Sequence, residues 1–374
     1  MIQKISFKNY NFKLLFTVII AILVGLLMVN SANSTYTQKN FYGICIAISL
    51  MVIVSFIDYR KYLNYYWILY IINLLLLSAT RVPFLGRSSN GATRWIRVLG
   101  FNFQPSELSK LILIIFVAAY IYKNQDNLNT FKTLFKLAIL LAFPLFLVVI
   151  QPDLSTTIVT FLILIVIIFV GGLSIKLIAI AGGITLPLSF VLIWYIQQPW
   201  QILLKPWQQR RVLSFLNPSK YISTESYQQI NALLAIGSGK IYGNGLNNNL
   251  ASSVKNGNYI PEPQTDFIFA IVGEDTGFIG TILTLLILFL IVILLINIAR
   301  KTNDIYGKLI CIGACSYVGL QTFINVGVVT MILPNTGLPL PFISYGLTSL
   351  FVSCILMGVC LNISRQTFKY YYRR

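Results

Sequence analysis

Repeated apolar runs, each long enough to cross a lipid bilayer, are the feature that most constrains this chain. A helix needs about 20 apolar residues to span roughly 30 Å of hydrocarbon, and residues 12–29, 134–150 and 266–298 are typical of such runs. Only 10% of the residues are charged, against about 25% in soluble domains. The sequence therefore excludes an ordinary soluble domain and predicts an all-α polytopic membrane protein.

The boundaries of these runs predict ten transmembrane helices in a single domain over residues 1–374. The spans are expected at about 12–29, 41–57, 67–79, 106–122, 134–150, 155–170, 177–196, 266–298, 309–329 and 342–363. One long extracellular loop, residues 197–265, separates the seventh from the eighth. A cleaved signal peptide would resemble the first run, but more spans follow it and no clear A-x-A site does.

The distribution of basic residues predicts the orientation. Lys4, Lys8 and Lys13 precede the first span, and cytoplasmic segments carry an excess of Lys and Arg. With the amino end inside, the inner segments hold more than half of the 28 Lys and Arg residues. The even number of spans then places both termini in the cytoplasm.

Residue types that are rare or missing limit the chemistry. The chain has no histidine, so acid and base catalysis must fall to carboxylates, Lys or Tyr. Its five cysteines lie in apolar runs and are expected to be small buried residues. A bound metal would have to be a hard cation held by carboxylate oxygens. The net charge of +18 could suggest a nucleic-acid partner. A nucleic-acid site needs a contiguous polar face, however, and this chain has few polar stretches, so no such partner is expected.

The acidic residues gather on the outer side of this topology. The outer acids are Glu107, Asp153, Glu225, Glu262, Asp266, Glu274 and Asp275. One short outer loop breaks the positive-inside rule with Arg81, Arg87, Arg94 and Arg97. These arginines could bind an anionic head group or phosphate, pair with the outer acids, or be solvated. The two sets together predict a polar site that faces outward.

Two polar segments at span ends contain candidate site residues. In residues 91–110, Pro105 suits the first turn of a helix and Glu107 is favoured near its amino end. Lys110 lies three residues further on and can pair with Glu107 on one helix face, and such a pair in lipid favours a functional role. In QPDLSTT, residues 151–157, Asp153 could be an N-cap or part of the site.

Two later segments complete the set. In residues 259–277, Thr265 or Asp266 could cap the following helix, while Glu274 and Asp275 lie two to three turns deeper. Residues 334–346 hold three prolines and two glycines, which interrupt the apolar run. Broken backbone at membrane depth is tolerated where protein or water lines it, so this segment is expected to form a cavity wall.

Taken in order, these motifs resemble the SEDS family (shape, elongation, division and sporulation). The matching pieces are TRW followed by FQPSELSK, then QPDLST, YQQINALLAIGSG with GNG, PEPQTDFIFAIVGEDTG, and NVGVVTMILPNTGLPLPFISYG. The resemblance implies a peptidoglycan glycosyltransferase that polymerises lipid II on the outer face of the bacterial cytoplasmic membrane. It also implies a class B penicillin-binding protein as partner.

The resemblance implies roles for particular residues. Asp266 of TDFIFA would be the catalytic carboxylate. The residues expected to line the substrate cavity are Arg94, Trp95, Gln104, Glu107, Lys110, Asp153, Glu262 and Ser344. Three departures from the family pattern leave the subfamily open: Lys240 after Gly239, Glu-Asp at 274–275 in place of a double Glu, and SYGLTSL in place of SYGGSS.

The expected reaction needs one base. Lipid II carries its sugar on a pyrophosphate that leaves as an anion, so Asp266 alone could deprotonate the acceptor hydroxyl for an inverting attack. Arg94, Lys110 or a divalent cation (Mg²⁺ or Mn²⁺) would stabilise the developing charge. A lipid II flippase and a non-catalytic scaffold are the alternatives. A flippase should carry polar residues through the inner half of the spans, and a scaffold does not explain Glu107 and Lys110.

Overall fold

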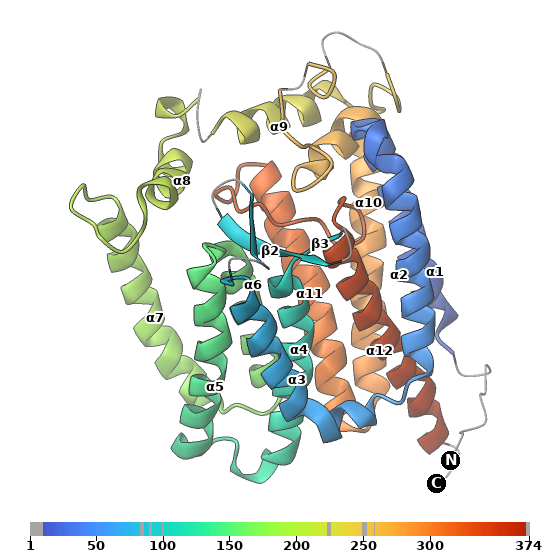
Figure 1. Ribbon diagram of the computed structural model, residues 1–374, viewed down its shortest axis with the longest axis vertical. Coiled ribbons are helices and arrows are strands. Elements are labelled where there is room, and N and C mark those ends of the chain that lie inside the picture. The colour runs from blue at the N-terminus through green and yellow to red at the C-terminus, as the bar shows by residue number, and fades with distance from the viewer. Residues whose placement is uncertain are drawn as a thin grey trace.

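The chain forms a bundle of long helices with a small sheet and short helices at one end (Figure 1). The computed structural model describes residues 10–82, 86–89, 92–98, 101–222, 226–248, 253–257 and 259–371. The elements are α1 (Phe12–Ala32), η2 (Ser34–Tyr36), α2 (Thr37–Phe56), α3 (Arg60–Ala79), β1 (Gly86–Ser89), β2 (Ala92–Val98), β3 (Phe101–Phe103), α4 (Pro105–Lys123), η3 (Gln125–Asn127), α5 (Phe131–Ile150), α6 (Leu154–Val170), α7 (Ile175–Ile196), α8 (Pro206–Leu216), η4 (Pro218–Lys220), α9 (Tyr227–Ser238), α10 (Ile268–Lys301), α11 (Ile305–Val329) and α12 (Leu347–Tyr371).

The bundle has two distinct ends (Figure 1). The start of α1 and the last turns of α12 lie at one, which we call the terminal end, while the sheet, α8 and α9 lie at the other, the loop end. Among the described residues, eight helices are long and apolar enough to cross a membrane, and α6 and the Pro187–Ile196 part of α7 are shorter apolar helices. The helical polytopic architecture is therefore confirmed, and the count of ten spans stays a prediction.

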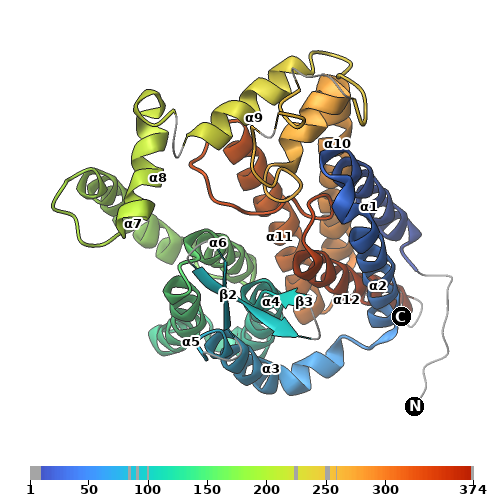
Figure 2. The ribbon, with the colours of Figure 1, turned by 45° about the horizontal axis from the view of Figure 1, so that its top comes forward.

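The helices differ in how much of their apolar surface is covered. Within their most apolar windows, 89% of α4 and 83% of α12 are buried, against 22% of α3 and α5. A helix that is apolar all round and buried belongs in the centre of a bundle. Accordingly, α4 packs against α3, α6 and α11, and α12 packs against α2 (Figure 2). The apolar side chains of α3 and α5 that stay uncovered suit contact with lipid.

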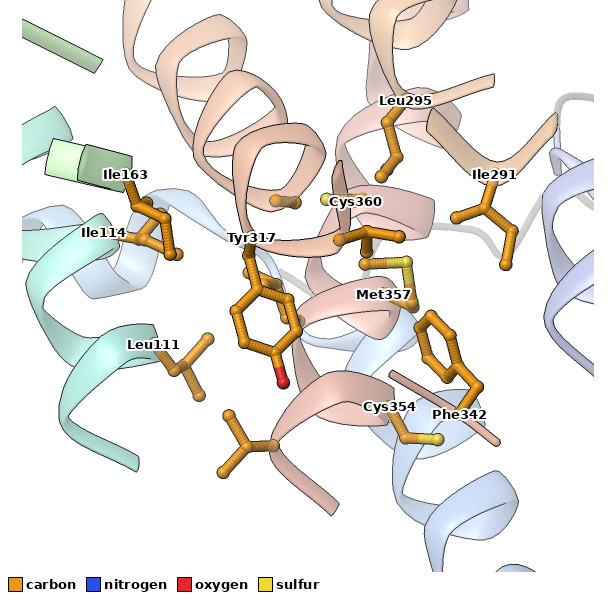
Figure 3. Close-up of a cluster of buried hydrophobic side chains, with 14 of the residues drawn as sticks. Leu111, Ile114, Ile163, Ile291, Leu295, Tyr317, Phe342, Cys354, Met357 and Cys360 are labelled. Atoms are coloured by element: carbon orange, nitrogen blue, oxygen red, sulfur yellow. The ribbon is translucent and has the colours of Figure 1, made fainter. Parts of the chain in front are cut away.

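The core lies between α4, α6, α10, α11 and α12. Figure 3 shows part of it, where Leu111 and Ile114 face Tyr317, and Met357 and Cys360 lie beyond that ring. Cys311, Cys354 and Cys360 are buried free thiols, but Cys45 is exposed. The expectation of buried cysteines is therefore wrong for Cys45, because the face of α2 that carries it is uncovered.

One region expected to be a loop contains a sheet. Residues 86–89, 92–98 and 101–103 form three antiparallel strands in the order β1-β2-β3. Strand β2 contains Thr, Trp, Ile and Val, which favour extended backbone. Residues 334–346 are irregular, as expected, but α12 begins at Leu347 rather than at 342. Pro339, Pro341 and the left-handed backbone of Phe342 (φ 65°) keep this stretch out of the helix.

Candidate functional site

Asp266 lies two residues before α10, where the long loop 197–265 enters the bundle. Its Oδ1 accepts a hydrogen bond from Thr265 Oγ1 at 2.8 Å, and its main-chain carbonyl accepts one from Asn325 Nδ2 at 2.7 Å. Phe267 is the N-cap residue of α10 and no side chain caps this helix, so the capping alternative for Thr265 or Asp266 is wrong.

The environment of this carboxyl group favours its neutral form. Burial raises the pKa of Asp266 above its usual value, while the hydrogen bond from Thr265 and the charge of Arg211 lower it by less. A carboxylate whose pKa is raised toward neutrality is a better proton acceptor near physiological pH. Asp266 therefore has the chemistry expected of a general base.

The irregular segment 334–346 lies against Asp266. Asn325 Nδ2 donates to Leu338 O at 2.7 Å as well as to Asp266, and Tyr345 N donates to Gln264 O at 2.8 Å. At Gly337 (φ 69°) an added Cβ would lie 3.6 Å from Asp266 Oδ2. This segment therefore forms a wall beside the carboxylate.

The expected pair between Glu107 and Lys110 is confirmed. Lys110 Nζ donates to Glu107 Oε1 at 2.7 Å and to Gln321 Oε1 at 3.1 Å, and it lies 5.2 Å from the centre of the Tyr317 ring. Glu107 is 2% exposed and Lys110 1%. The second oxygen, Glu107 Oε2, is buried without a protein partner, which leaves one acceptor in the site unused.

Two amides of α11 connect this pair with Asp266. Gln321 Nε2 donates to Pro339 O at 2.9 Å, and Gln321 also holds Lys110. Asn325 lies one helical turn further on, a spacing that puts both amides on the same helix face. Gln321 was not among the residues predicted from the sequence, although an amide within an apolar span is a signal for a polar interior.

Asp153 is the centre of a second polar group. Its Oδ1 accepts from Thr156 N at 3.2 Å and so caps α6, while Oδ2 accepts from Gln104 Nε2 at 3.1 Å and from Ser106 Oγ at 3.4 Å. Arg94 Nη1 lies 3.7 Å from Asp153 Oδ1. Asp153 is therefore both an N-cap and part of a polar cluster. The first two turns of α4 carry Ser106 of this cluster as well as the pair Glu107 and Lys110.

Arg94 reaches this cluster from a β-bulge. Strand β1 pairs Arg87 with Trp95 and Ser88 with Thr93, so Arg94 is the extra residue of β2, and a bulge re-aims the side chain that it carries. Arg94 Nε is buried and lacks a protein partner, whereas Arg97 is exposed. Trp95 is half-buried next to Arg94. The side chain of Arg87 lies outside the described residues.

Other predicted residues support the backbone. Ser344 Oγ accepts from Leu340 N at 2.8 Å within the irregular segment. Glu262 is exposed with φ 50°, and its carbonyl accepts from Thr265 N and Thr265 Oγ1. The structure thus places Glu107 and Lys110 in one polar group, which Gln321 and Asn325 link to Asp266. Arg94, Gln104 and Asp153 form a second group, joined to the first along the chain by the adjacent Ser106 and Glu107 of α4. Glu262 closes the turn before Asp266, and its side chain points to solvent.

Metal ligands do not cluster in the part of the chain that the structure describes. No three Asp, Glu, Cys or His side chains come together there, so a divalent cation would lack an all-protein cage. Mg²⁺ is often held by one or two carboxylates together with substrate phosphates. Asp266 Oδ2 and Glu107 Oε2 are oxygens of that kind.

Comparisons with known proteins identify relatives of this chain over almost its whole length. The family model for cell cycle proteins of the FtsW, RodA and SpoVE type matches residues 10–369. Stage V sporulation protein E of Bacillus subtilis is 36% identical over 376 residues, covering 94% of this chain and 97% of that protein. The probable peptidoglycan glycosyltransferase FtsW of Geobacter sulfurreducens is 32% identical over 371 residues, covering 96% of each chain.

Solved structures share the fold. A chain from a structure on the coordination of polymerization and crosslinking by a peptidoglycan synthase complex is 25% identical, with a TM-score of 0.81, and covers 96% of this chain and 99% of that one. The rod shape-determining protein RodA of Thermus thermophilus is 24% identical, with a TM-score of 0.68 over 97% of this chain and 99% of that one.

Proposed function

This chain belongs to the FtsW, RodA and SpoVE family of cell cycle proteins, and we propose that it is a peptidoglycan glycosyltransferase. It polymerises lipid II into glycan strands on the outer face of the bacterial cytoplasmic membrane and releases undecaprenyl pyrophosphate. Both termini are cytoplasmic, so the loop end faces outward. The observation that carries the proposal is a partly buried carboxylate, Asp266, fixed at the loop end beside a wall of irregular backbone.

Asp266 acts as the general base. It takes the proton of the acceptor sugar 4-hydroxyl, whose oxygen forms a bond to the anomeric carbon of the donor, with inversion. The bond from that carbon to the pyrophosphate oxygen breaks, and its electron pair leaves with the pyrophosphate. Because this leaving group is already an anion, no general acid is required, in contrast to the carboxylate pairs of glycosidases.

Cations of the site stabilise the negative charge that moves onto the pyrophosphate. Arg94 presents a planar guanidinium with a buried, unused N–H donor, which suits a bidentate contact with phosphate oxygens. Lys110 holds Glu107 and Gln321 in place and keeps positive charge inside the bundle. A divalent cation on the pyrophosphate would supply further charge neutralisation.

A class B penicillin-binding protein is the proposed partner. The structural relative with the higher TM-score comes from a peptidoglycan synthase complex, and newly made glycan strands must be crosslinked. A transporter role is less consistent with the site, because the buried charge pairs lie at the loop end. The polar groups of the terminal end hold the helices together.

Purified protein, reconstituted with its partner in vesicles that contain lipid II, tests the proposal. We expect glycan polymer from the wild type and a loss on the order of 10²- to 10⁴-fold in Asp266→Asn, the range typical of a general base. Asp126→Asn changes an exposed acid at the terminal end and should polymerise normally. Full activity of Asp266→Asn would refute the assignment, and lipid II transport without polymer would favour a flippase.

A further inference from the structure

Helix α10 is divided near its loop end at Gly277, whose φ of 63° and ψ of −162° are not helical. In a regular helix each amide binds the carbonyl four residues earlier, so a break leaves amides after it without partners. The turn 240–245 supplies them. Phe278 N donates to Lys240 O at 2.9 Å, and Ile279 N donates to Ile241 O at 3.2 Å.

The same turn satisfies the carbonyls before the break. Asn244 N donates to Glu274 O at 2.9 Å, and Gly245 N donates to Asp275 O at 3.0 Å. Gly243 has φ 83°, and an added Cβ there would lie 2.2 Å from Asp275 O, so only glycine allows this approach. Residues 268–276 are therefore a separate short helix, docked on the turn 240–245, with Asp266 just before its start.

Buried side chains fasten this short helix to two other parts of the chain. Asp275 Oδ1 accepts from Lys255 Nζ at 2.6 Å, and Asp275 Oδ2 accepts from Ser31 Oγ at 2.5 Å. Lys255 Nζ also donates to Ser31 Oγ at 2.9 Å, and Glu274 Oε1 accepts from Val254 N at 2.8 Å. The Lys255 and Asp275 side chains are 2% and 0% exposed. The long loop, the end of α1 and α10 thus meet at one ion pair.

We propose that Lys255 and Asp275 are a positioning pair that fixes the angle of residues 268–276 and hence the place of Asp266. A buried ion pair adds little stability over apolar residues of the same size, but its directed bonds hold two segments in one geometry. Only the non-helical residue Gly277 joins the short helix to the rest of α10. The inference rests on the proposed function only in taking Asp266 as the base.

Activity separates positioning from stability when two variants are compared. Lys255→Met leaves the Asp275 charge buried and unpaired, whereas the double variant Lys255→Met with Asp275→Leu removes both charges. We expect kcat for lipid II polymerisation to fall on the order of 10- to 100-fold in both, with KM for lipid II changed by less than about threefold. The double variant should regain the thermal stability that the single one loses. Recovery of wild-type kcat in the double variant would overturn the inference.

Hydrogen exchange gives a readout that does not depend on activity. In the full-length protein, Lys255→Met should speed exchange at the amides of Asn244, Gly245 and Val254, whose acceptors belong to Glu274 and Asp275. Lys240→Gln removes an exposed lysine of the same loop and should leave these amides protected. Unchanged exchange in Lys255→Met would refute the positioning pair even if Asp266 proves essential. Faster exchange in Lys255→Met, together with a wild-type protein that makes no polymer, would support the positioning pair and refute the proposed function instead.

Discussion

The two ends of the bundle both contain buried polar side chains, but they differ in what those side chains leave unused. At the terminal end, Asp304 caps α11 by accepting from Gly307 N at 3.2 Å and also accepts from Tyr59 Oη at 2.7 Å. Asn362 accepts from Tyr59 N and donates to Ser55 O. These contacts join α2, α11, α12 and the start of α3, and the acid and amide groups in them are engaged.

At the loop end several buried polar atoms have no protein partner. They include Arg94 Nε, Glu107 Oε2, Gln264 Oε1 and Asn325 Oδ1. The terminal end has fewer in the described part of the chain, Tyr306 Oη and Arg365 Nη1, and neither belongs to a carboxylate. Since most buried polar atoms in proteins are paired, the unused carboxylate and amide oxygens of the loop end indicate where a ligand completes the contacts. The difference separates a polar network that builds the fold from the one that we propose binds substrate.

The largest effect is expected from breaking the pair at the centre of the loop end. Lys110→Met would leave Glu107 buried and unpaired, which costs about 3–5 kcal/mol of stability, and it should abolish polymerisation. Tyr59→Phe removes one hydrogen bond at the terminal end and should cost about 1 kcal/mol without changing activity per folded molecule. Thermal unfolding in detergent and a lipid II assay measure both quantities. Equal behaviour of the two variants would remove the distinction between the ends.

Within the loop end, the bulged arginine should matter more than its neighbour on the same strand. Arg94→Gln removes the charge proposed to face the pyrophosphate, and we expect polymerisation to fall on the order of 10²-fold. Arg94→Lys keeps the charge but loses the planar guanidinium, so its activity should lie between that of the wild type and that of Arg94→Gln. Arg97→Gln, on an exposed side chain, is the matched control and should behave as wild type. A similar loss in both glutamine variants would point to a general effect of positive charge.

A smaller effect should appear in the pH dependence. Asp266 must be ionised to act as a base, so activity should fall about tenfold per pH unit below its pKa, which burial raises above the usual value. The Thr265 hydroxyl stabilises the ionised form. Thr265→Val should therefore raise the pKa of Asp266 and move the acidic limb of the profile to higher pH. A limb that stays in place or moves to lower pH would contradict the assigned hydrogen bond.

The helices and part of the site could be predicted from the sequence. Apolar run length located the helices, because the cost of burying polar backbone in lipid leaves few alternatives. Helical spacing alone predicted the contact between Glu107 and Lys110, since residues three apart share a face. Asp266 needed the family resemblance, because its partner Asn325 is far away in sequence.

Other features depended on tertiary contacts that a linear pattern does not contain. The bulge that places Arg94 arises from the register between two strands. The break at Gly277 is satisfied by a turn more than thirty residues earlier, and Ser31 meets Asp275 across most of the chain. Gln321 was visible as a polar residue in an apolar run, but its contact with Lys110 was not.

The closest comparison of the two ends uses two aspartates that have the same local role. Asp153 caps α6 at the loop end and Asp304 caps α11 at the terminal end, each by accepting a backbone N–H. Asp153→Ala and Asp304→Ala should each cost about 1 kcal/mol, the usual value of an N-cap.

Their effects on activity should differ. Asp153 also holds Gln104 and lies near Arg94, so Asp153→Ala should lower polymerisation several-fold beyond its effect on the amount of folded protein, whereas Asp304→Ala should not. Activity is normalised to folded protein measured by size-exclusion chromatography. If both variants lose activity only in proportion to folded protein, Asp153 is a cap alone, and the substrate site ends at Glu107 and Lys110.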